Sequence, residues 1–301
     1  MSRKVLSITG KVLIGAGVLV LLFVAYQVWG TALLESHTQN QLRSTLQSET
    51  SNEEIRHALA EASALDKLPT GPPNTAPRTG APSEGQPVGD LRIPVIGINQ
   101  VFVEGTNTND LRKGPGHYTG TPIPGQPGNA SIAGHRTTYG HPFYNLDSVK
   151  KGDPIVVTTL QGIFVYDAIS SQVVSPNDTS VIDNTFANWI TLTTCNPRFS
   201  ASTRLIVQAK LAHSQLFPNS GLPAATNTAA QNDNLAGNTG VELTQTFFWG
   251  FLVVIVGVGV GYGAWRFRRQ RWVIYGVGTV GMLVLLWYFF GAISPLLPAS
   301  F

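Results

Sequence analysis

The sequence predicts an all-β domain with membrane-spanning helices on both sides of it, one before and two after. Two observations support this fold class. Three runs of the chain are apolar and long enough to cross a bilayer, which takes about 20 such residues per helix. Between the first and second runs, residues 90–212 hold many short segments of β-branched and aromatic residues, which is typical of an all-β barrel or sandwich.

The apolar runs also predict a topology. Arg3, Lys4 and Lys11 precede the first run, and the loop between the last two runs reads RFRRQR. Because cytoplasmic loops collect Lys and Arg, both clusters are expected inside, and the β domain is expected on the extracytoplasmic face of a multi-pass plasma-membrane protein. A cleaved signal peptide is the alternative for the first run, but the run is long for one and a poor cleavage pattern follows it.

The remaining segments are predicted from composition. Residues 31–68 are polar, with leucines such as Leu42 and Leu46 at loose helical spacing. Residues 69–89 are rich in Pro, Gly, Thr and Ser, a composition with too little apolar surface to order itself. The predicted boundaries are a cytoplasmic tail (1–11), a transmembrane anchor (12–30), an extracytoplasmic helical stalk (31–68), a linker (69–89), the β domain (90–212), a second linker (213–244), a transmembrane helix (245–265), a basic cytoplasmic loop (266–271), a transmembrane helix (272–291) and an extracytoplasmic tail (292–301).

Within the β domain, Gly, Pro, Asn or Asp separates the predicted strands, and short helical turns are expected near 109–113 and 142–149. The formal net charge is only +3, and no Lys/Arg patch with interleaved aromatic residues occurs in this domain, so nucleic acid is not an expected partner. The predicted strands are LRIPVIGI, QVFVEG, NASIAGH, DPIVVTTL, GIFVYDAIS, ITLTTC and RLIVQAKL.

Cys195 is the single cysteine of the chain, so an exported domain cannot use it for an internal disulfide. A packed core residue and an intermolecular crosslink are the plain alternatives. Its surroundings favour a reactive thiol, because pairing of ITLTTC with RLIVQAKL as a hairpin would put Cys195 and Arg204 on one polar face. Arg204 cannot act as a base, but its fixed charge and fork of donors suit a thiolate and a developing oxyanion.

A nucleophilic cysteine also needs an acid–base partner. His135 is the strongest candidate, because it follows the short strand over 130–133 and one glycine and therefore lies at a strand end. His117 and His141, in neighbouring loops, are the rival candidates.

Together these residues resemble the sortase family, the cysteine transpeptidases of Gram-positive cell surfaces. TLTTC over 191–195 is similar to the family's TLxTC motif, Arg204 follows it, and AGHRTTYG lies upstream. The resemblance covers 90–211, and the sequence around His135 is most similar to the actinobacterial class E group. The C-terminal hairpin departs from many relatives. Class C, the pilin-polymerising group, also has a C-terminal membrane segment, but its Asp-Pro-aromatic lid is absent here.

The resemblance implies an eight-stranded β-barrel with short helices, and a reaction carried out by His135, Cys195 and Arg204. Cys195 would attack the Thr–Gly bond of an LPxTG- or LAxTG-type sorting signal, Arg204 would stabilise the oxyanion, and His135 would transfer protons. The implied partners are surface proteins that bear the signal, the membrane, and an amine acceptor from a lipid-linked peptidoglycan precursor or a pilin. The candidate substrate-binding residues are Thr194, His117 and Tyr118.

No cofactor or metal is expected, because the implied chemistry needs none and the aspartates of the domain lack the spacing of a calcium loop. Two other functions stay open on the sequence alone. One is a cell-wall cysteine hydrolase, in which water resolves the thioester. The other is a non-catalytic envelope scaffold whose cysteine is merely packed.

Overall fold

A computed structural model of the protein describes residues 3–48, 68–217 and 243–294. The chain forms two compact units. One unit contains the N-terminal helix and the C-terminal helical hairpin, and the other begins at Thr31 and contains a helix and the β domain.

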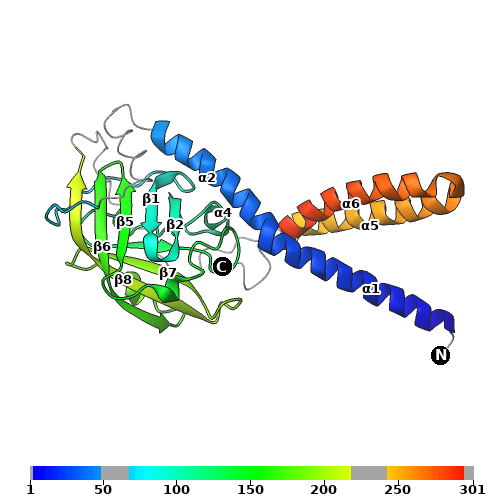
Figure 1. Cartoon of the computed structure of the whole chain (residues 1–301), viewed down its shortest axis with the longest axis horizontal. Coiled ribbons are helices and arrows are strands. Elements are labelled where there is room, and N and C mark those ends of the chain that lie inside the picture. Colours follow the sequence, from blue (N-terminus) through cyan, green and yellow to red (C-terminus); the bar gives the residue numbers. More distant parts are fainter. Residues whose placement is uncertain (1–2, 49–67, 218–242, 295–301) are drawn as a thin grey trace. The chain divides into compact units, whose positions relative to one another are not determined.

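The β domain is a closed barrel of eight strands, in the order β1-β2-β3-β4-β7-β8-β6-β5. Figure 1 shows β6, β5, β1 and β2 side by side in that order. The pairs β2–β3 and β4–β7 are parallel, and the other neighbouring pairs are antiparallel. The strands are β1 (Pro87–Ile93), β2 (Ile98–Glu104), β3 (Gly116–His117), β4 (Asn129–Ala133), β5 (Pro154–Thr159), β6 (Gly162–Val174), β7 (Trp189–Asn196) and β8 (Thr203–Leu216).

Short helices lie in the connections, as predicted. The helix α4 begins after Asn107, whose side chain accepts hydrogen bonds from the backbone N–H groups of Asn109 and Asp110 and so caps the first turn. The short helices of the barrel unit are η2 (Pro94–Ile96), α4 (Thr108–Leu111), η3 (Leu146–Ser148) and η4 (Thr179–Ile182).

Alternating side chains fill the barrel. In β7, Ile190 and Leu192 belong to the main hydrophobic core, while Thr191 and Thr193 face away from it. Phe102, Phe164 and Tyr166 are almost completely buried, and burying a side chain of this size contributes about 1.5–3 kcal/mol. The predicted alternation of β7 is therefore confirmed.

The segment before β1 differs from the prediction of a linker over 69–89. Pro87 already belongs to β1, and Ala76 is buried in the barrel core with its N–H bonded to the Gly125 carbonyl at 2.8 Å. Gln126 donates to the Thr79 hydroxyl at 2.9 Å. Backbone and side-chain hydrogen bonds to the barrel thus order a segment whose few apolar residues would not order it alone.

The predicted stalk also differs from expectation. Residues 31–48 are helical, as predicted, but this helix, α2 (Thr31–Ser48), packs on β1 and β2. Leu42 and Leu46 are buried against Val101 and Val103. Residues 49–67 of the predicted stalk, and residues 218–242 of the second predicted linker, lie outside the described residues; β8 continues to Leu216, beyond the predicted end of the domain.

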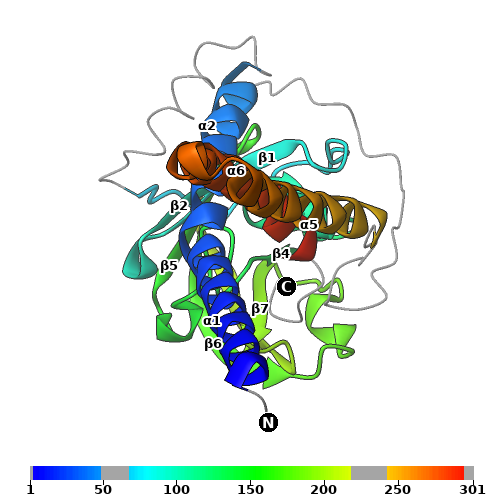
Figure 2. The same ribbon diagram turned by 90° about the vertical axis from the view of Figure 1, so that its right-hand side faces the viewer.

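Among the described residues, three helices are long and apolar enough to cross a membrane; the first runs on from α1 into α2, and the other two are α5 and α6. Figures 1 and 2 show α5 and α6 running alongside each other. Tyr26, Leu286 and Phe290 form a small buried cluster, whereas most apolar side chains of these helices point outward, as lipid-facing residues would. The elements are α1 (Arg3–Ala25), η1 (Tyr26–Gly30), α5 (Leu243–Arg266), η5 (Arg268–Gln270) and α6 (Arg271–Ile293).

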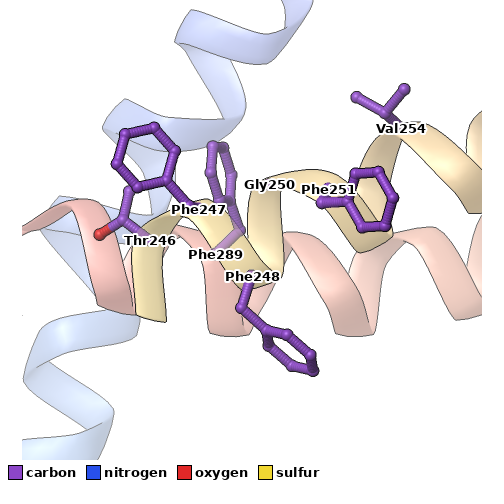
Figure 3. A pocket seen from close by; sticks show the side chains of 7 residues that line it. All are labelled: Thr246, Phe247, Phe248, Gly250, Phe251, Val254 and Phe289. Atoms are coloured by element: carbon purple, nitrogen blue, oxygen red, sulfur yellow. The ribbon is translucent and has the colours of Figure 1, made fainter. Parts of the chain in front are cut away.

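An apolar pocket lies at one end of the α5–α6 hairpin (Figure 3). Phenylalanine side chains supply most of its lining, and Thr246 is its polar member. The Thr246 hydroxyl donates to the Ala292 carbonyl at 3.0 Å, which satisfies it within the helical pair.

Candidate active site

Two strand pairings bring the predicted residues to one end of the barrel. In the antiparallel β7–β8 ladder, Cys195 is directly opposite Arg204. In the parallel β4–β7 ladder, Ala133 pairs with Thr193, and the Gly134 N–H continues the pattern by donating to the Thr193 carbonyl at 3.1 Å. The strand β4 ends at Ala133, two residues before His135, at the same end of the parallel pair at which β7 reaches Cys195. The predicted hairpin between the two runs is thus confirmed.

The Cys195 side chain is buried, and the charges of two guanidinium groups act on it. Burial raises the pKa of the Cys195 thiol, while the charges of Arg204 and Arg136 lower it. Desolvation is the larger effect, so the thiol is protonated at neutral pH. The two guanidinium groups supply the stabilisation that a thiolate needs once its proton has been removed.

Arg204 is held by the β7–β8 turn. Its Nη1 donates to the carbonyls of Ala201 and Thr203 at 2.9 and 3.1 Å, and the residue is only 3 % exposed. Two backbone acceptors therefore fix the guanidinium beside the thiol. This arrangement suits a preorganised donor for a developing negative charge.

The His135 ring is buried, and neither ring nitrogen has a hydrogen-bond partner among the described residues. It packs against Tyr139 with ring centroids 5.1 Å apart, and the Arg112 guanidinium lies 5.6 Å from the Tyr139 ring centroid. Burial, followed by the charge of Arg112, lowers the pKa of His135 to about 3. The imidazole is therefore neutral at neutral pH.

Thr194 lies between the two strand ends. Its hydroxyl donates to the Gly134 carbonyl at 2.7 Å, and the side chain is buried. This bond joins the residue before Cys195 to the residue before His135. Its geometry fits the ordering of the site better than direct contact with a substrate.

Tyr118 is buried beneath the site. Its hydroxyl bonds the Thr193 hydroxyl at 2.9 Å. Burial is the main cause that raises the pKa of Tyr118 to about 12, and the charges of Arg204 and Cys195 also act on it. Tyr118 therefore supports β7 close to the predicted nucleophile.

His117 was predicted to bind substrate and was an alternative to His135 as the acid–base residue. Its position in the barrel fits neither role. His117 is fully buried, with Nδ1 2.7 Å from the Glu104 carboxylate and Nε2 3.0 Å from the Pro122 carbonyl. Burial disfavours its charged form, but the Glu104 carboxylate outweighs this and the pKa of His117 is raised. Both ring nitrogens are occupied by the barrel, so His117 is a structural residue. His141, the other rival, has its ring against Tyr144.

Arg136 is a site residue that the sequence reasoning missed. Its Nη1 donates to the Cys195 carbonyl at 3.1 Å and to Asn196 Oδ1 at 2.7 Å, while Nη2 pairs with Asp147 at 3.1 Å. Asp147 also pairs with Arg198. The available signal was the arginine directly after His135, but a single residue type in a loop does not reveal that it reaches back to β7.

Within the described ranges, no group of three or more His, Cys, Asp or Glu side chains is arranged to hold a metal ion. The site consists instead of a thiol, a neutral imidazole and two guanidinium groups. Such a set can carry out nucleophilic acyl transfer with proton transfer by the imidazole.

A sortase domain family model matches residues 91–212, which span nearly the whole barrel. Residues 91–212 therefore form a sortase domain. Among curated relatives, Sortase SrtE1 of Streptomyces coelicolor is 34% identical over 218 residues, which cover 67% of this chain and 56% of that relative. Sortase SrtE2 of the same organism is 27% identical over 230 residues, which cover 71% of this chain and 85% of that relative.

The chain therefore spans little more than half the length of SrtE1. Among solved structures, sortase E from Streptomyces avermitilis is 36% identical, with 46% of this chain and 99% of that chain covered and a TM-score of 0.42.

Proposed function

We propose that this protein is a membrane-anchored cysteine transpeptidase with Cys195 as nucleophile, His135 as acid–base group and Arg204 as oxyanion donor. The observation that carries the proposal is the pairing of Cys195 with Arg204 across the β7–β8 ladder, together with His135 at the end of the adjacent parallel strand. The sortase domain over residues 91–212 supports the same reaction class.

The first half of the reaction forms an acyl-enzyme. His135 takes the proton of the Cys195 thiol as the sulfur attacks the carbonyl carbon of the Thr–Gly bond in an LPxTG- or LAxTG-type signal. Arg204 and the neighbouring positive charge of Arg136 stabilise the negative charge that develops on the oxygen and the sulfur. The His135 imidazolium then gives its proton to the leaving glycine nitrogen, the C–N bond breaks, and a thioester to Cys195 remains.

The second half transfers the acyl group to an amine. The acceptor amine attacks the thioester carbonyl and loses a proton to His135. The tetrahedral intermediate collapses, the C–S bond breaks, and the Cys195 sulfur recovers its proton from His135. Burial keeps the His135 imidazole neutral, and the neutral form is the one that accepts the proton in each half of the cycle. The acceptor class is an amino group of a lipid-linked peptidoglycan precursor or of a pilin.

The membrane part of the proposal rests on charge. Arg266, Arg268, Arg269 and Arg271 cluster between α5 and α6, and cytoplasmic loops collect such residues. With α1 as the anchor, the barrel then lies on the extracytoplasmic face, where sorting signals and cell-wall amines are available.

The test is a ligation assay with the full chain in detergent micelles. A fluorescent LAxTG or LPxTG peptide is incubated with the protein, with and without triglycine, and the products are separated by mass. A ligated product that depends on triglycine and disappears in Cys195→Ala supports transpeptidation. Cleavage at the same rate with and without the amine would identify a hydrolase. An intact peptide would instead favour a non-catalytic scaffold.

A further inference from the structure

The helix α2 carries a polar stripe on the face that packs on the barrel. Thr31, Glu35 and Gln39 are spaced four residues apart, so they lie on one side of the helix. All three are buried, at 1%, 5% and 9% exposure. Polar side chains are rarely buried without a hydrogen-bonding task, and this stripe belongs to the barrel unit rather than to the membrane helices.

The two ends of the stripe bind two different barrel segments. At its start, the Thr31 hydroxyl accepts a hydrogen bond from the Tyr139 backbone N–H at 3.2 Å. At its end, Gln39 donates to the carbonyls of Val101 and Lys113 at 2.8 Å each, and its oxygen accepts from the Val101 N–H at 2.8 Å. One helix face therefore holds the loop after β4 and the turn after α4 in a fixed relation.

Glu35, in the middle of the stripe, lies against the same loop. A Cβ at Gly140 would meet Glu35 Oε2 at 2.5 Å, so a larger residue would have to displace the Glu35 carboxylate, and the φ of +69° also favours glycine. Close contact of a side chain with the loop backbone restricts the loop's movement. The 139–140 segment is thus held both by a hydrogen bond and by packing.

Both segments that the stripe holds are neighbours of His135. The Tyr139 ring packs on the His135 ring. The guanidinium of Arg112, the residue before Lys113, lies over the Tyr139 ring. His135 has no hydrogen bond of its own to orient it among the described residues. Its ring position consequently depends on Tyr139, whose backbone is tied to Thr31.

We propose that the Thr31–Glu35–Gln39 face of α2 is a positioning element that sets the His135 ring for proton transfer. This inference rests on the proposed function, because it assigns His135 the acid–base role. These residues do not touch the reacting atoms; they act through Tyr139 and the 112–113 turn. Loss of the Thr31 bond should therefore lower the rate of the chemical step without weakening peptide binding.

The experiment uses the full chain in micelles and the ligation assay above. Thr31→Val removes the acceptor of the Tyr139 N–H and keeps the side-chain shape. We expect kcat to fall about tenfold to hundredfold, the size of effect that a small misplacement of a reacting group produces, with KM within about twofold. The melting temperature should fall only by the modest amount that one buried N–H without its acceptor causes. Thr31→Ser, which retains the hydroxyl, should restore kcat.

Thr38→Val is the matched control, since the Thr38 hydroxyl bonds the Leu34 carbonyl within the helix itself. A second pair, Gln39→Ala against the exposed Gln41→Ala, tests the other end of the stripe and covers the case in which Thr31→Val fails to fold. Equal kcat in Thr31→Val and Thr38→Val would overturn the proposal, as would failure of Thr31→Ser to restore a lowered kcat.

Hydrogen–deuterium exchange gives a readout that does not depend on activity. Exchange in the peptide covering 134–141 should increase in Thr31→Val and stay unchanged in Thr38→Val. An inactive wild-type chain that still shows this difference would refute the transpeptidase assignment and support the coupling of α2 to the loop. Equal exchange in the two variants would refute the coupling even if the ligation reaction is found.

Discussion

Cys195 and Arg204 face each other across the β7–β8 ladder, so a thiol and a guanidinium are held together by backbone hydrogen bonds rather than by a loop. The residues of a cross-strand pair have Cβ atoms about 4.5–5.5 Å apart. The turn between them, residues 197–202, also supplies the Ala201 carbonyl that anchors the guanidinium. The positive charge beside the proposed nucleophile is therefore held in place by the sheet and the turn.

This relationship predicts the effect of replacing Arg204. Arg204→Ala should lower kcat/KM for peptide ligation by about 10²–10³-fold, the usual cost of an oxyanion donor. Arg204→Lys should recover only part of the loss, because an ammonium keeps the charge but not the planar fork. Ligation kinetics measure both changes. A rate for Arg204→Ala within a few-fold of wild type would remove Arg204 from the mechanism.

Arg136 is expected to act on the same thiol from the other side. Arg136→Met removes a positive charge that lowers the pKa of Cys195 and also removes the donor to the Cys195 carbonyl. The apparent pKa of the thiol should therefore rise, and alkylation at a fixed alkaline pH should slow. The measurement is the pH profile of iodoacetamide labelling, with Lys210→Met on the exposed part of β8 as the control for a lost surface charge. An unshifted profile in Arg136→Met contradicts this role.

His135→Gln should affect both catalysis and acid stability. Loss of the acid–base group should cost about 10²–10⁴-fold in rate. The pKa of His135 is lowered to about 3 by burial and by Arg112, whereas the unfolded chain binds its proton near 6.5. Between these values the unfolded state holds more protons, so wild-type stability falls as the pH drops from about 6.5 toward 3.

The His135→Gln variant should lack this contribution, and its stability should fall less steeply over that range. Denaturant unfolding measured at several pH values tests the slope, and ligation kinetics test the rate. A wild-type slope in the variant would show that His135 is not held neutral by the fold.

His117 is expected to matter for stability and not for chemistry. His117→Ala leaves the buried Glu104 carboxylate without its partner, which typically costs about 3–5 kcal/mol. Because the pKa of His117 is raised, its ion pair contributes fully below pH 6.5, and this contribution is lost as the pH rises through the folded-state value. Chemical denaturation at two pH values measures both effects.

The double variant Glu104→Gln/His117→Gln removes the unpaired charge and should recover part of the stability. The rate per folded molecule should stay near that of wild type in each variant. If His117→Ala lowered kcat and left stability unchanged, His117 would be assigned a role in substrate binding or catalysis.

The parts of the site that follow from local periodicity could be predicted from the sequence. Alternation in TLTTC and RLIVQAKL placed Cys195 and Arg204 on one face, because a strand has a period of two and a short hairpin has few possible registers. The strand β3 gave no such signal, since two residues are too short to show a pattern.

The parts that depend on contacts between distant segments could not be predicted in the same way. The position of His135 follows from the parallel β4–β7 pairing, which no local pattern reveals. His117 was assigned to a groove because a loop sequence does not show that Glu104 lies beside it in the fold. The inner face of α2 is polar along Thr31 and Gln39, so its composition matches an exposed stalk although it is buried.

The packing of α2 and of the segment before β1 has a practical consequence for the choice of expression boundaries. Expression boundaries chosen from the family match, near residue 90, would discard a helix that contributes Leu42 and Leu46 to the barrel surface and an irregular segment that contributes Ala76 to its interior. A truncated product cut there would expose apolar side chains to water and invite aggregation. A boundary immediately after Gly30 removes the N-terminal apolar helix and keeps the barrel unit, which begins at Thr31.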